Sequence, residues 1–253
     1  MAKGQGTRNK AQGARHKARG QTIPQILDGF SLLIRIHIFR TIMIKLTVDN
    51  KEIEAEAGAV LLQVCLDHDI YIPNLCHIKD MKPPAASCRL CFVEIDGKNG
   101  PVTSCTIRIE EGMVVRTDTA AVRQLQRSAL QFLLSVHHVD CAHCPANKKC
   151  VLQKMAKFLK VGLKPKQLEP HLKEAEIDPS HPCLDYYPNR CVLCGRCVTV
   201  CKAKHDQPFL TFAKRGLDTV ISFYGEENTS DMPCRDCAAC ADVCPVSALT
   251  MKV

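Results

Sequence analysis

The sequence lacks an apolar run long enough to cross a bilayer. Residues Phe30–Phe39 are apolar, but Arg35 and His37 interrupt them, and the stretch falls well short of the roughly 20 residues that a transmembrane helix needs. We therefore expect no membrane span. The chain also contains no G-x-G-x-x-G motif after a predicted strand and no P-loop, so the sequence indicates no nucleotide-binding segment of its own.

Acidic residues are scarce at the N-terminus. Residues 1–42 hold eight Lys and Arg residues against the single Asp28, so almost all of the net charge of +8 lies there. Because the rest of the chain is nearly neutral, we expect no nucleic-acid partner. The Gly, Lys, Arg and Gln content predicts a disordered basic extension over 1–42. Alternatively, residues 22–42 form an amphipathic anchor or partner-binding segment, or Met43 is the natural start, because a well-formed domain begins there.

Cysteine is abundant, yet no secretory signal accompanies it. The chain has 17 cysteines, an odd number, and most of them stand two or three residues apart. Disulfides belong to oxidising compartments, and such close spacing does not permit many independent bridges. The cysteines therefore indicate metal binding.

The pattern of apolar and polar residues predicts an α+β fold. Alternation predicts a β-hairpin over 43–56 and further strands at 91–95 and 113–116. Helices are expected over 59–69, where Cys65 falls on the apolar face, and over 120–136. In the second helix, apolar residues recur at spacings of three and four: Val122, Leu125, Ala129, Leu133 and Val136.

The C-terminal part repeats a cysteine motif at an offset of 43 residues. Each copy reads C-x2-C-x2-C-x3-C, and in this arrangement the fourth cysteine of each run binds the other [4Fe–4S] cluster. Zinc is the alternative, but a duplicated run of four cysteines exceeds what zinc ribbons use. The two predicted ligand sets are Cys191, Cys194, Cys197 and Cys244, and Cys234, Cys237, Cys240 and Cys201.

Two further sets precede the repeat. Cys76, Cys88, Cys91 and Cys105 follow the spacing C-x11-C-x2-C-x13-C, which is looser than that of plant-type [2Fe–2S] centres. The β-grasp-like pattern before them favours a [2Fe–2S] cluster over zinc. The middle set consists of Cys141, Cys144 and Cys150 with three histidines nearby, His137, His138 and His143. Three thiolates and one imidazole complete a four-ligand site for a cluster or for zinc, and spacing does not decide which histidine binds.

In order, these motifs resemble the N-terminal part of the large iron–sulfur subunit of complex I and the accessory-cluster region of [FeFe]-hydrogenases. In length, the chain resembles the small diaphorase subunit of NAD-reducing hydrogenases. The resemblance covers about residues 43–253, and three local phrases carry it: Ser87–Glu94 (SCRLCFVE), Cys150–Gln153 (CVLQ) and Pro188–Cys197 (PNRCVLCGRC). The chain departs from the family at Ala86, where glycine is common in such loops.

The resemblance implies that His137 is the fourth ligand of the middle cluster. It also implies three domains: a β-grasp [2Fe–2S] ferredoxin domain (43–119), a small helical [4Fe–4S] domain with one His and three Cys ligands (120–175), and a bacterial-type 2×[4Fe–4S] ferredoxin domain (176–253). Cys65 and Cys183 remain outside the four sets.

The expected cofactors are one [2Fe–2S] and three [4Fe–4S] clusters. We expect no hydrogen-activating or molybdenum centre after Val253, so the chain is not catalytic by itself. The resemblance implies a cytoplasmic hetero-oligomer, or one peripheral to a membrane through its partners. Those partners are a flavoprotein subunit with FMN and NAD(P)H and a second catalytic subunit, such as a hydrogenase, formate dehydrogenase or other low-potential reductase. The alternatives are an independent polyferredoxin-type carrier and a zinc-organised scaffold.

Metal analysis separates clusters from zinc. Four clusters of these types predict about 14 iron atoms per chain, with a matching amount of acid-labile sulfide. The measurement is elemental and sulfide analysis of protein purified without oxygen. A few zinc atoms and no iron would contradict the cluster assignment.

Overall fold

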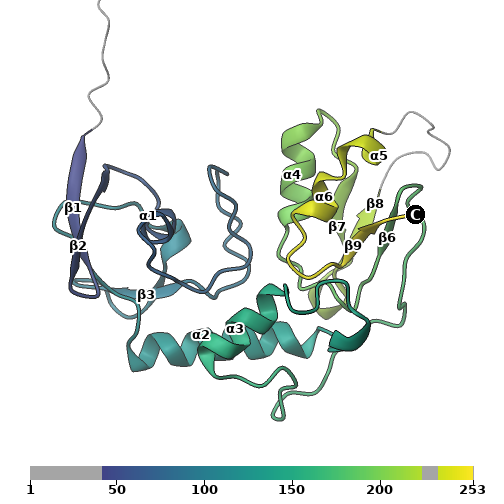
Figure 1. Cartoon of the computed structure of the whole chain (residues 1–253), viewed down its shortest axis with the longest axis horizontal. Coiled ribbons are helices and arrows are strands. Elements are labelled where there is room, and N and C mark those ends of the chain that lie inside the picture. The colour runs from purple at the N-terminus through teal and green to yellow at the C-terminus, as the bar shows by residue number, and fades with distance from the viewer. Residues whose placement is uncertain (1–41, 224–232, 253) are drawn as a thin grey trace, which may run out of the picture. The chain divides into compact units, whose positions relative to one another are not determined.

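The computed structural model describes residues 42–223 and 233–252, and it is a mixed α/β structure (Figure 1). The expectations for residues 1–41, including the basic extension and the alternative anchor, lie outside the described residues. Among the helices in those two ranges, none is both long and apolar enough to cross a membrane.

The N-terminal part is built on a five-stranded sheet in the order β2-β1-β5-β3-β4. Strands β1 and β5 run parallel, and the other neighbours are antiparallel. In β1, Ile44, Leu46 and Val48 are buried and alternate with more exposed residues, because successive side chains of a strand point to opposite faces. The strands are β1 (Met43–Val48), β2 (Lys51–Glu56), β3 (Phe92–Ile95), β4 (Val102–Thr103) and β5 (Val114–Arg116).

The predicted hairpin and first helix are confirmed. Asp49 and Asn50 join β1 to β2, and both have positive φ angles, 50° and 68°, which a two-residue hairpin turn of this type requires. Helix α1 (Leu61–Asp67) contributes Leu61 and Cys65 to the core of the sheet. Burial and the charge of Asp49 raise the pKa of the Cys65 thiol to about 12, which suits a buried core residue.

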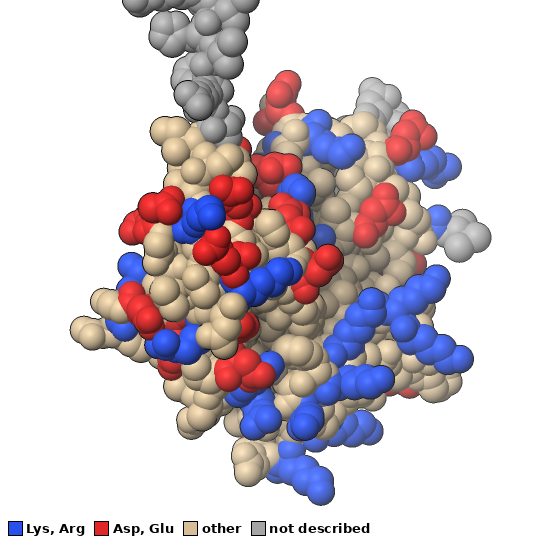
Figure 2. All heavy atoms as spheres, turned by 60° about the vertical axis from the view of Figure 1, so that its left-hand side comes forward, with Lys and Arg blue, Asp and Glu red and all other residues tan. Residues whose placement is uncertain are grey.

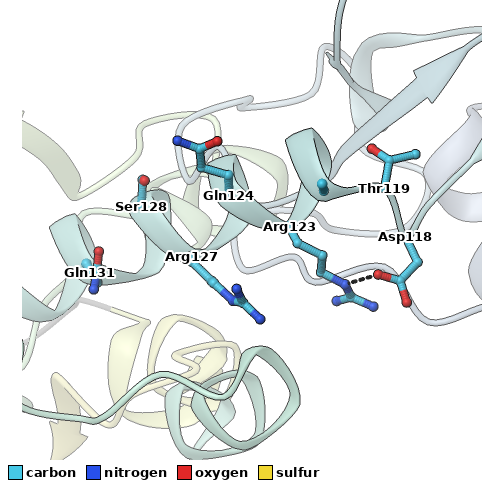
Figure 3. Close-up of a pocket in the computed structure, with 8 residues that line it drawn as sticks. Asp118, Thr119, Arg123, Gln124, Arg127, Ser128 and Gln131 are labelled. Atoms are coloured by element: carbon cyan, nitrogen blue, oxygen red, sulfur yellow. Dashed lines mark hydrogen bonds and ion pairs between the residues drawn. The ribbon is translucent and has the colours of Figure 1, made fainter.

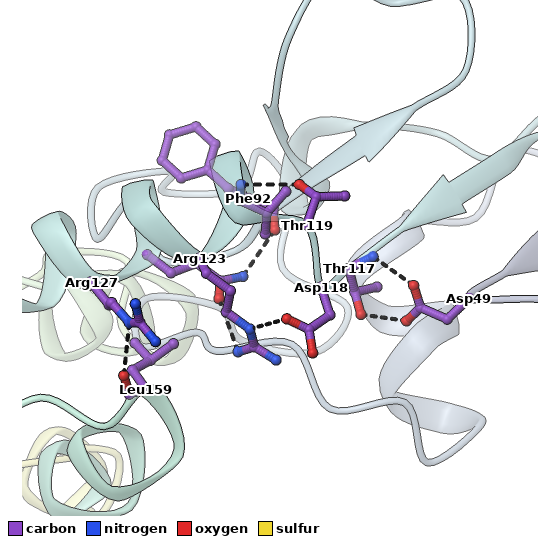
Figure 4. Close-up of polar contacts among 10 residues, drawn as sticks. Asp49, Phe92, Thr117, Asp118, Thr119, Arg123, Arg127 and Leu159 are labelled. Carbon is purple, nitrogen blue, oxygen red and sulfur yellow. Dashed lines mark hydrogen bonds and ion pairs between the residues drawn. The ribbon is translucent and has the colours of Figure 1, made fainter.

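Helix α2 (Ala120–Ser135) is tied to the sheet by side-chain hydrogen bonds (Figure 4). The Asp49 carboxylate accepts from the Thr117 backbone at 2.8 Å and from the Thr117 hydroxyl. Thr119 caps the helix, because its hydroxyl accepts from Val122 N at 3.2 Å. Gln126 donates to the carbonyl oxygen of Phe92 in β3 at 3.1 Å. These contacts hold the start of α2 against the sheet.

The buried face of α2 differs from the predicted one. Val122 is buried as expected, but Leu125 is 38% exposed, and the next buried positions are Gln126, Leu130 and Leu134. The predicted stripe is therefore wrong at Leu125, whereas Ala129 and Leu133 pack partly buried against the core. The physical reason is the amide of Gln126, which is buried because it has a hydrogen-bond partner in β3.

Helix α3 (Val151–Leu159) packs against α2. Arg127 of α2 donates to the carbonyl oxygen of Leu159 at 3.0 Å, which satisfies one acceptor at the C-terminal end of α3. The guanidinium of Arg123 lies 4.3 Å from the centroid of the Phe158 ring. The two helices are thus joined by polar and cation–π contacts as well as by their apolar faces.

The C-terminal part contains two small antiparallel sheets, β6 with β9 and β7 with β8. Helix α4 packs against α6 and β7, and α4 and α6 each carry cysteines from a different copy of the repeat. None of these elements was predicted from the sequence. They are β6 (Leu184–Tyr186), α4 (Arg196–Lys204), β7 (Leu210–Ala213), β8 (Val220–Phe223), α5 (Cys234–Cys237), α6 (Ala239–Asp242) and β9 (Leu249–Met251).

Charged side chains of both signs cover the visible face of the described part. In Figure 2, Lys and Arg gather towards the lower right, whereas acidic and basic side chains mix over the upper left. The mixture agrees with the near neutrality of the chain after residue 42.

Candidate metal centres

The N-terminal cysteines lie in loops around the five-stranded sheet, and all four are buried. Cys91 directly precedes β3, and Cys105 belongs to the short 3-10 helix Ser104–Thr106. Both the backbone N–H and the hydroxyl of Ser104 donate to the carbonyl oxygen of Cys91, at 2.9 and 2.8 Å. Ser104 therefore holds the two segments together.

These four thiols are close enough to influence one another's ionisation. Cys76 and Cys88 share a hydrogen bond, which lowers the pKa of Cys76 and raises that of Cys88. The hydrogen bond between Cys91 and Cys105 likewise lowers the pKa of Cys91 and raises that of Cys105. After burial, the charges of the other three cysteines raise the pKa of Cys105 further. The structure thus brings the predicted [2Fe–2S] ligands together as two pairs.

The loop that carries Cys88 needs unusual backbone geometry. Ala86 has φ 48° and Arg89 has φ 53°, both in the left-handed region that glycine enters most easily. Ala86 therefore adopts the left-handed conformation, which explains why glycine is common at this position in similar loops.

The middle set lines one pocket. Its lining includes His137, Cys141, Cys144 and Cys150, together with His138. Cys141 lies in the 3-10 helix Cys141–His143, and Cys150 is the N-cap residue of α3. Burial and the neighbouring Cys144 and Cys141 raise the pKa of Cys150.

The three histidines of this region differ in their hydrogen bonds. Nδ1 of His137 lies 2.9 Å from the carbonyl oxygen of Arg190, so Nδ1 carries the proton and Nε2 is left with a free lone pair. Metal-bound histidines usually have such a partner on the other ring nitrogen. Burial also lowers the pKa of His137, which favours the neutral ring. His143, by contrast, has an 82% exposed side chain and pairs with Asp140 at 2.8 Å.

The first C-terminal set combines residues from both copies of the repeat. Burial raises the pKa of Cys194 to about 12, and the charges of Cys244 and Cys191 add to the effect. Burial and the charges of Cys191, Cys194 and Cys244 also raise the pKa of Cys197. The charge of Cys244, from the second copy, thus acts on all three cysteines of the first copy.

The second C-terminal set shows the reciprocal exchange. Cys201, Cys234, Cys237 and Cys240 line one hollow. Burial raises the pKa of Cys234 to about 11 and that of Cys240 to about 12, and in both cases the charge of Cys201 contributes. The structure therefore groups Cys201 with the second copy and Cys244 with the first, as in the predicted sets.

Backbone N–H groups point at three of these sulfur atoms. Leu193 N donates to Cys191 Sγ at 3.4 Å, Phe209 N to Cys201 Sγ at 3.3 Å, and Ala248 N to Cys244 Sγ at 3.2 Å. Hydrogen bonds of this kind stabilise a thiolate and tune the potential of a bound cluster.

Two orphaned nitrogen atoms test whether the sites suit a bound group. Within residues 42–223 and 233–252, the buried side-chain polar atoms without a hydrogen-bond partner are Nε2 of His181 and Nε of Arg196. His181 lines the hollow of the second C-terminal set, and the charge of Arg196 acts on Cys194 of the first. Buried polar groups rarely lack a partner, so both atoms fit a sulfur-rich group bound next to them. Neither residue was predicted as part of a site: Arg196 falls within the phrase Pro188–Cys197, but its spacing suggests no role, and His181 lies outside the motifs.

A further pocket of the described residues is lined mainly by charged and polar side chains and by no cysteine. The pocket at the first turns of α2 is lined by residues such as Asp118, Arg123 and Arg127, and by none of the sixteen predicted ligands (Figure 3). Among the residues the structure describes, no three His, Cys, Asp or Glu side chains are arranged to hold a single metal ion.

Three protein families match successive parts of the chain. Residues 41–120 match the 2Fe-2S iron-sulfur cluster binding domain. Residues 126–163 match the NADH-ubiquinone oxidoreductase-G iron-sulfur binding region, and residues 181–250 match the ferredoxin-like domain of NADH-quinone oxidoreductase subunit 3. Successive parts of the chain are thus similar to these iron–sulfur families. It therefore contains 2Fe-2S and 4Fe-4S binding domains, and the resemblance predicted from its motifs is confirmed.

The relatives of this iron–sulfur chain are parts of NAD- or NADP-linked oxidoreductases. It is 35% identical over 211 residues to an NADH-quinone oxidoreductase subunit of Rhizobium meliloti, a match that covers 82% of this chain and 24% of the relative. It is 30% identical over 214 residues to a subunit of the NADP-reducing hydrogenase of Solidesulfovibrio fructosivorans, covering 82% of this chain and 36% of the relative. The chain thus spans about a quarter to a third of the length of these curated relatives.

A solved structure is similar in fold to this chain, and the match covers a larger share of that structure's chain than of the two relatives above. A chain in the crystal structure of an NAD+-reducing [NiFe]-hydrogenase in the H2-reduced state matches with a TM-score of 0.72 and 29% identity. The match covers 83% of this iron–sulfur chain and 88% of the hydrogenase chain.

The left-handed conformation of Ala86 gives a stability prediction. Ala86→Gly should stabilise the protein by about 1 kcal/mol, because a left-handed alanine costs more than the extra unfolded-state freedom of glycine. The measurement is the denaturant midpoint at which the visible absorbance of the [2Fe–2S] centre is lost.

Ala85→Gly is the matched control. Ala85 is exposed and is not among the residues with positive φ, so its replacement should lower stability by about 0.4–1 kcal/mol. Equal shifts of both variants in the same direction would contradict the role of backbone strain at Ala86.

Proposed function

We propose that this chain is the iron–sulfur electron-transfer subunit of a multisubunit NAD(P)H-linked oxidoreductase. It holds one [2Fe–2S] cluster in a β-grasp domain (43–119), one [4Fe–4S] cluster in a small helical domain (120–175), and two [4Fe–4S] clusters in a ferredoxin-type domain (176–253). Its partners are a flavoprotein subunit and a second catalytic redox subunit. The location that follows is cytoplasmic, or peripheral to a membrane through those partners.

The observation that carries this proposal is the grouping of the cysteines. Sequence spacing assigned Cys201 and Cys244 to the other copy of the repeat, and Cys201 lines one hollow with Cys234, Cys237 and Cys240 of the second copy. Crossed ligation is typical of two-cluster ferredoxins and has no counterpart in zinc ribbons. The matches to three iron–sulfur families support the same conclusion.

The chain's own residues would hold and tune the clusters. When bound, such clusters accept and release single electrons over a wide range of potentials. The thiolates bind iron, buried loops exclude water, and the N–H groups of Leu193, Phe209 and Ala248 offset negative charge on sulfur. With no nucleotide-binding motif, the chain passes electrons between partners and forms no product itself.

The hydrogen bond of His137 supports its role as the fourth ligand of the middle cluster. We predict that His137→Ala perturbs one [4Fe–4S] signal in electron paramagnetic resonance, spares the others, and removes at most about four iron atoms per chain. His143→Ala is the matched control, because His143 is exposed and its ring pairs with Asp140. An unchanged spectrum for His137→Ala, or the same change in both variants, would contradict the assignment.

Two observations favour a subunit over an independent carrier. The relatives named above are subunits of larger enzymes, and 88% of a chain of an NAD+-reducing [NiFe]-hydrogenase is matched. We therefore expect the native protein, purified from its own cells without oxygen, to elute with a flavin-containing subunit and a second redox subunit.

The test is size-exclusion chromatography combined with mass spectrometry and flavin fluorescence. In the expected result, the iron of this chain and the flavin elute together and NAD(P)H bleaches the iron–sulfur absorbance. An isolated iron-loaded monomer that shuttles electrons alone would instead establish the independent carrier.

A further inference from the structure

His181 is the most deeply buried histidine of the described residues and belongs to none of the predicted ligand sets. The residue is 2% exposed, and it precedes strand β6. The ring packs against Phe223 of β8, with a distance of 4.7 Å between the ring centroids. It also lines the hollow formed by the second C-terminal cysteine set. The fold therefore holds the imidazole rigidly beside four cysteines.

The hydrogen-bond pattern determines which ring nitrogen carries the proton. The backbone N–H of Cys183 donates to Nδ1 of His181 at 3.0 Å, so Nδ1 presents its lone pair. A neutral imidazole with an acceptor at Nδ1 has its proton on Nε2. That N–H group is inaccessible to water and has no partner among the described residues. An unpaired buried donor costs about 1–3 kcal/mol, so a group that accepts its hydrogen bond is expected there.

We propose that Nε2–H of His181 donates a hydrogen bond to a sulfur of the [4Fe–4S] centre held by Cys201, Cys234, Cys237 and Cys240, and thereby raises the reduction potential of that centre. This inference rests on the proposed function. Reduction adds negative charge to the cluster, and a fixed N–H dipole stabilises the reduced form more than the oxidised form. His181 is a tuning residue, because it acts on the centre without ligating iron.

The neighbouring Cys183 provides a control. Its charge contributes to the raised pKa of Cys234, so its thiol also lies near this set. Its hydrogen bond to His181, however, comes from the backbone N–H. Cys183→Ala keeps this N–H and removes the thiol, which separates an effect of the thiol from an effect of the imidazole.

The test is a redox titration of the full iron-loaded chain, monitored by electron paramagnetic resonance. His181→Phe keeps an aromatic ring against Phe223 but removes the donor. It should shift the equilibrium of one [4Fe–4S] centre about tenfold towards the oxidised form, which is about 59 mV to more negative potential for a one-electron couple. That centre should differ from the one altered by His137→Ala. His181→Gln retains an N–H donor, so its potential should lie between those of His181→Phe and the wild type.

The controls distinguish failure of this inference from failure of the proposed function. Unchanged potentials in His181→Phe with full iron content, or an equal shift in Cys183→Ala, would overturn the role of His181 and leave the four clusters intact. Wild-type protein without iron would overturn the proposed function itself.

A second measurement compares wild-type protein with His181→Phe, both labelled with 15N-histidine. His205 also lines this hollow, and it is present in both proteins. Electron–nuclear double resonance should detect a histidine nitrogen at the second C-terminal centre of the wild type that is lost in His181→Phe and retained in His137→Ala. An unchanged histidine signal in His181→Phe would overturn the proposal.

Discussion

The crowding of thiols in buried loops is the constraint on which the rest of the structure depends. Burial and mutual repulsion raise the pKa of Cys194, Cys197, Cys234 and Cys240, so these folded sites oppose the ionised form that binds metal. A bound metal centre reverses this balance, because a coordinated thiol loses its proton. Cluster binding and folding are therefore coupled, above all in the C-terminal part, where each sheet has only two strands.

The secondary structure serves mainly to hold the ligand loops. Cys91 directly precedes β3, Cys150 is the N-cap of α3, and α4 carries Cys197 and Cys201. Cys91 and Cys150 thus adjoin hydrogen-bonded elements that also contribute to the core, through Val93 of β3 and Leu152 of α3. Gln126 of α2 also donates a hydrogen bond to Phe92 of β3. This buried contact joins the sheet that carries the predicted [2Fe–2S] ligands to the helix that precedes the middle set.

Some elements could be predicted because their signals are local. The hairpin over 43–56 and the helix 61–67 follow from alternation, a two-residue turn and short-range periodicity. The pairing of β6 with β9 joins three-residue strands more than sixty residues apart, and segments so short carry no pattern of their own. The face of α2 was predicted wrongly at Leu125, because the burial of the amide at Gln126 depends on an acceptor in β3.

The sequence by itself determined the number, spacing and duplication of the cysteines, because ligand spacing within an iron–sulfur motif is a local property of the chain, and it predicted their crossed grouping. The ligand sets themselves stay predictions. Only the tertiary structure decided which nitrogen of His137 is free and that His181 has an unpaired donor beside the second C-terminal set. Both depend on where a distant or neighbouring backbone group lies in space, and such positions leave no trace in sequence spacing.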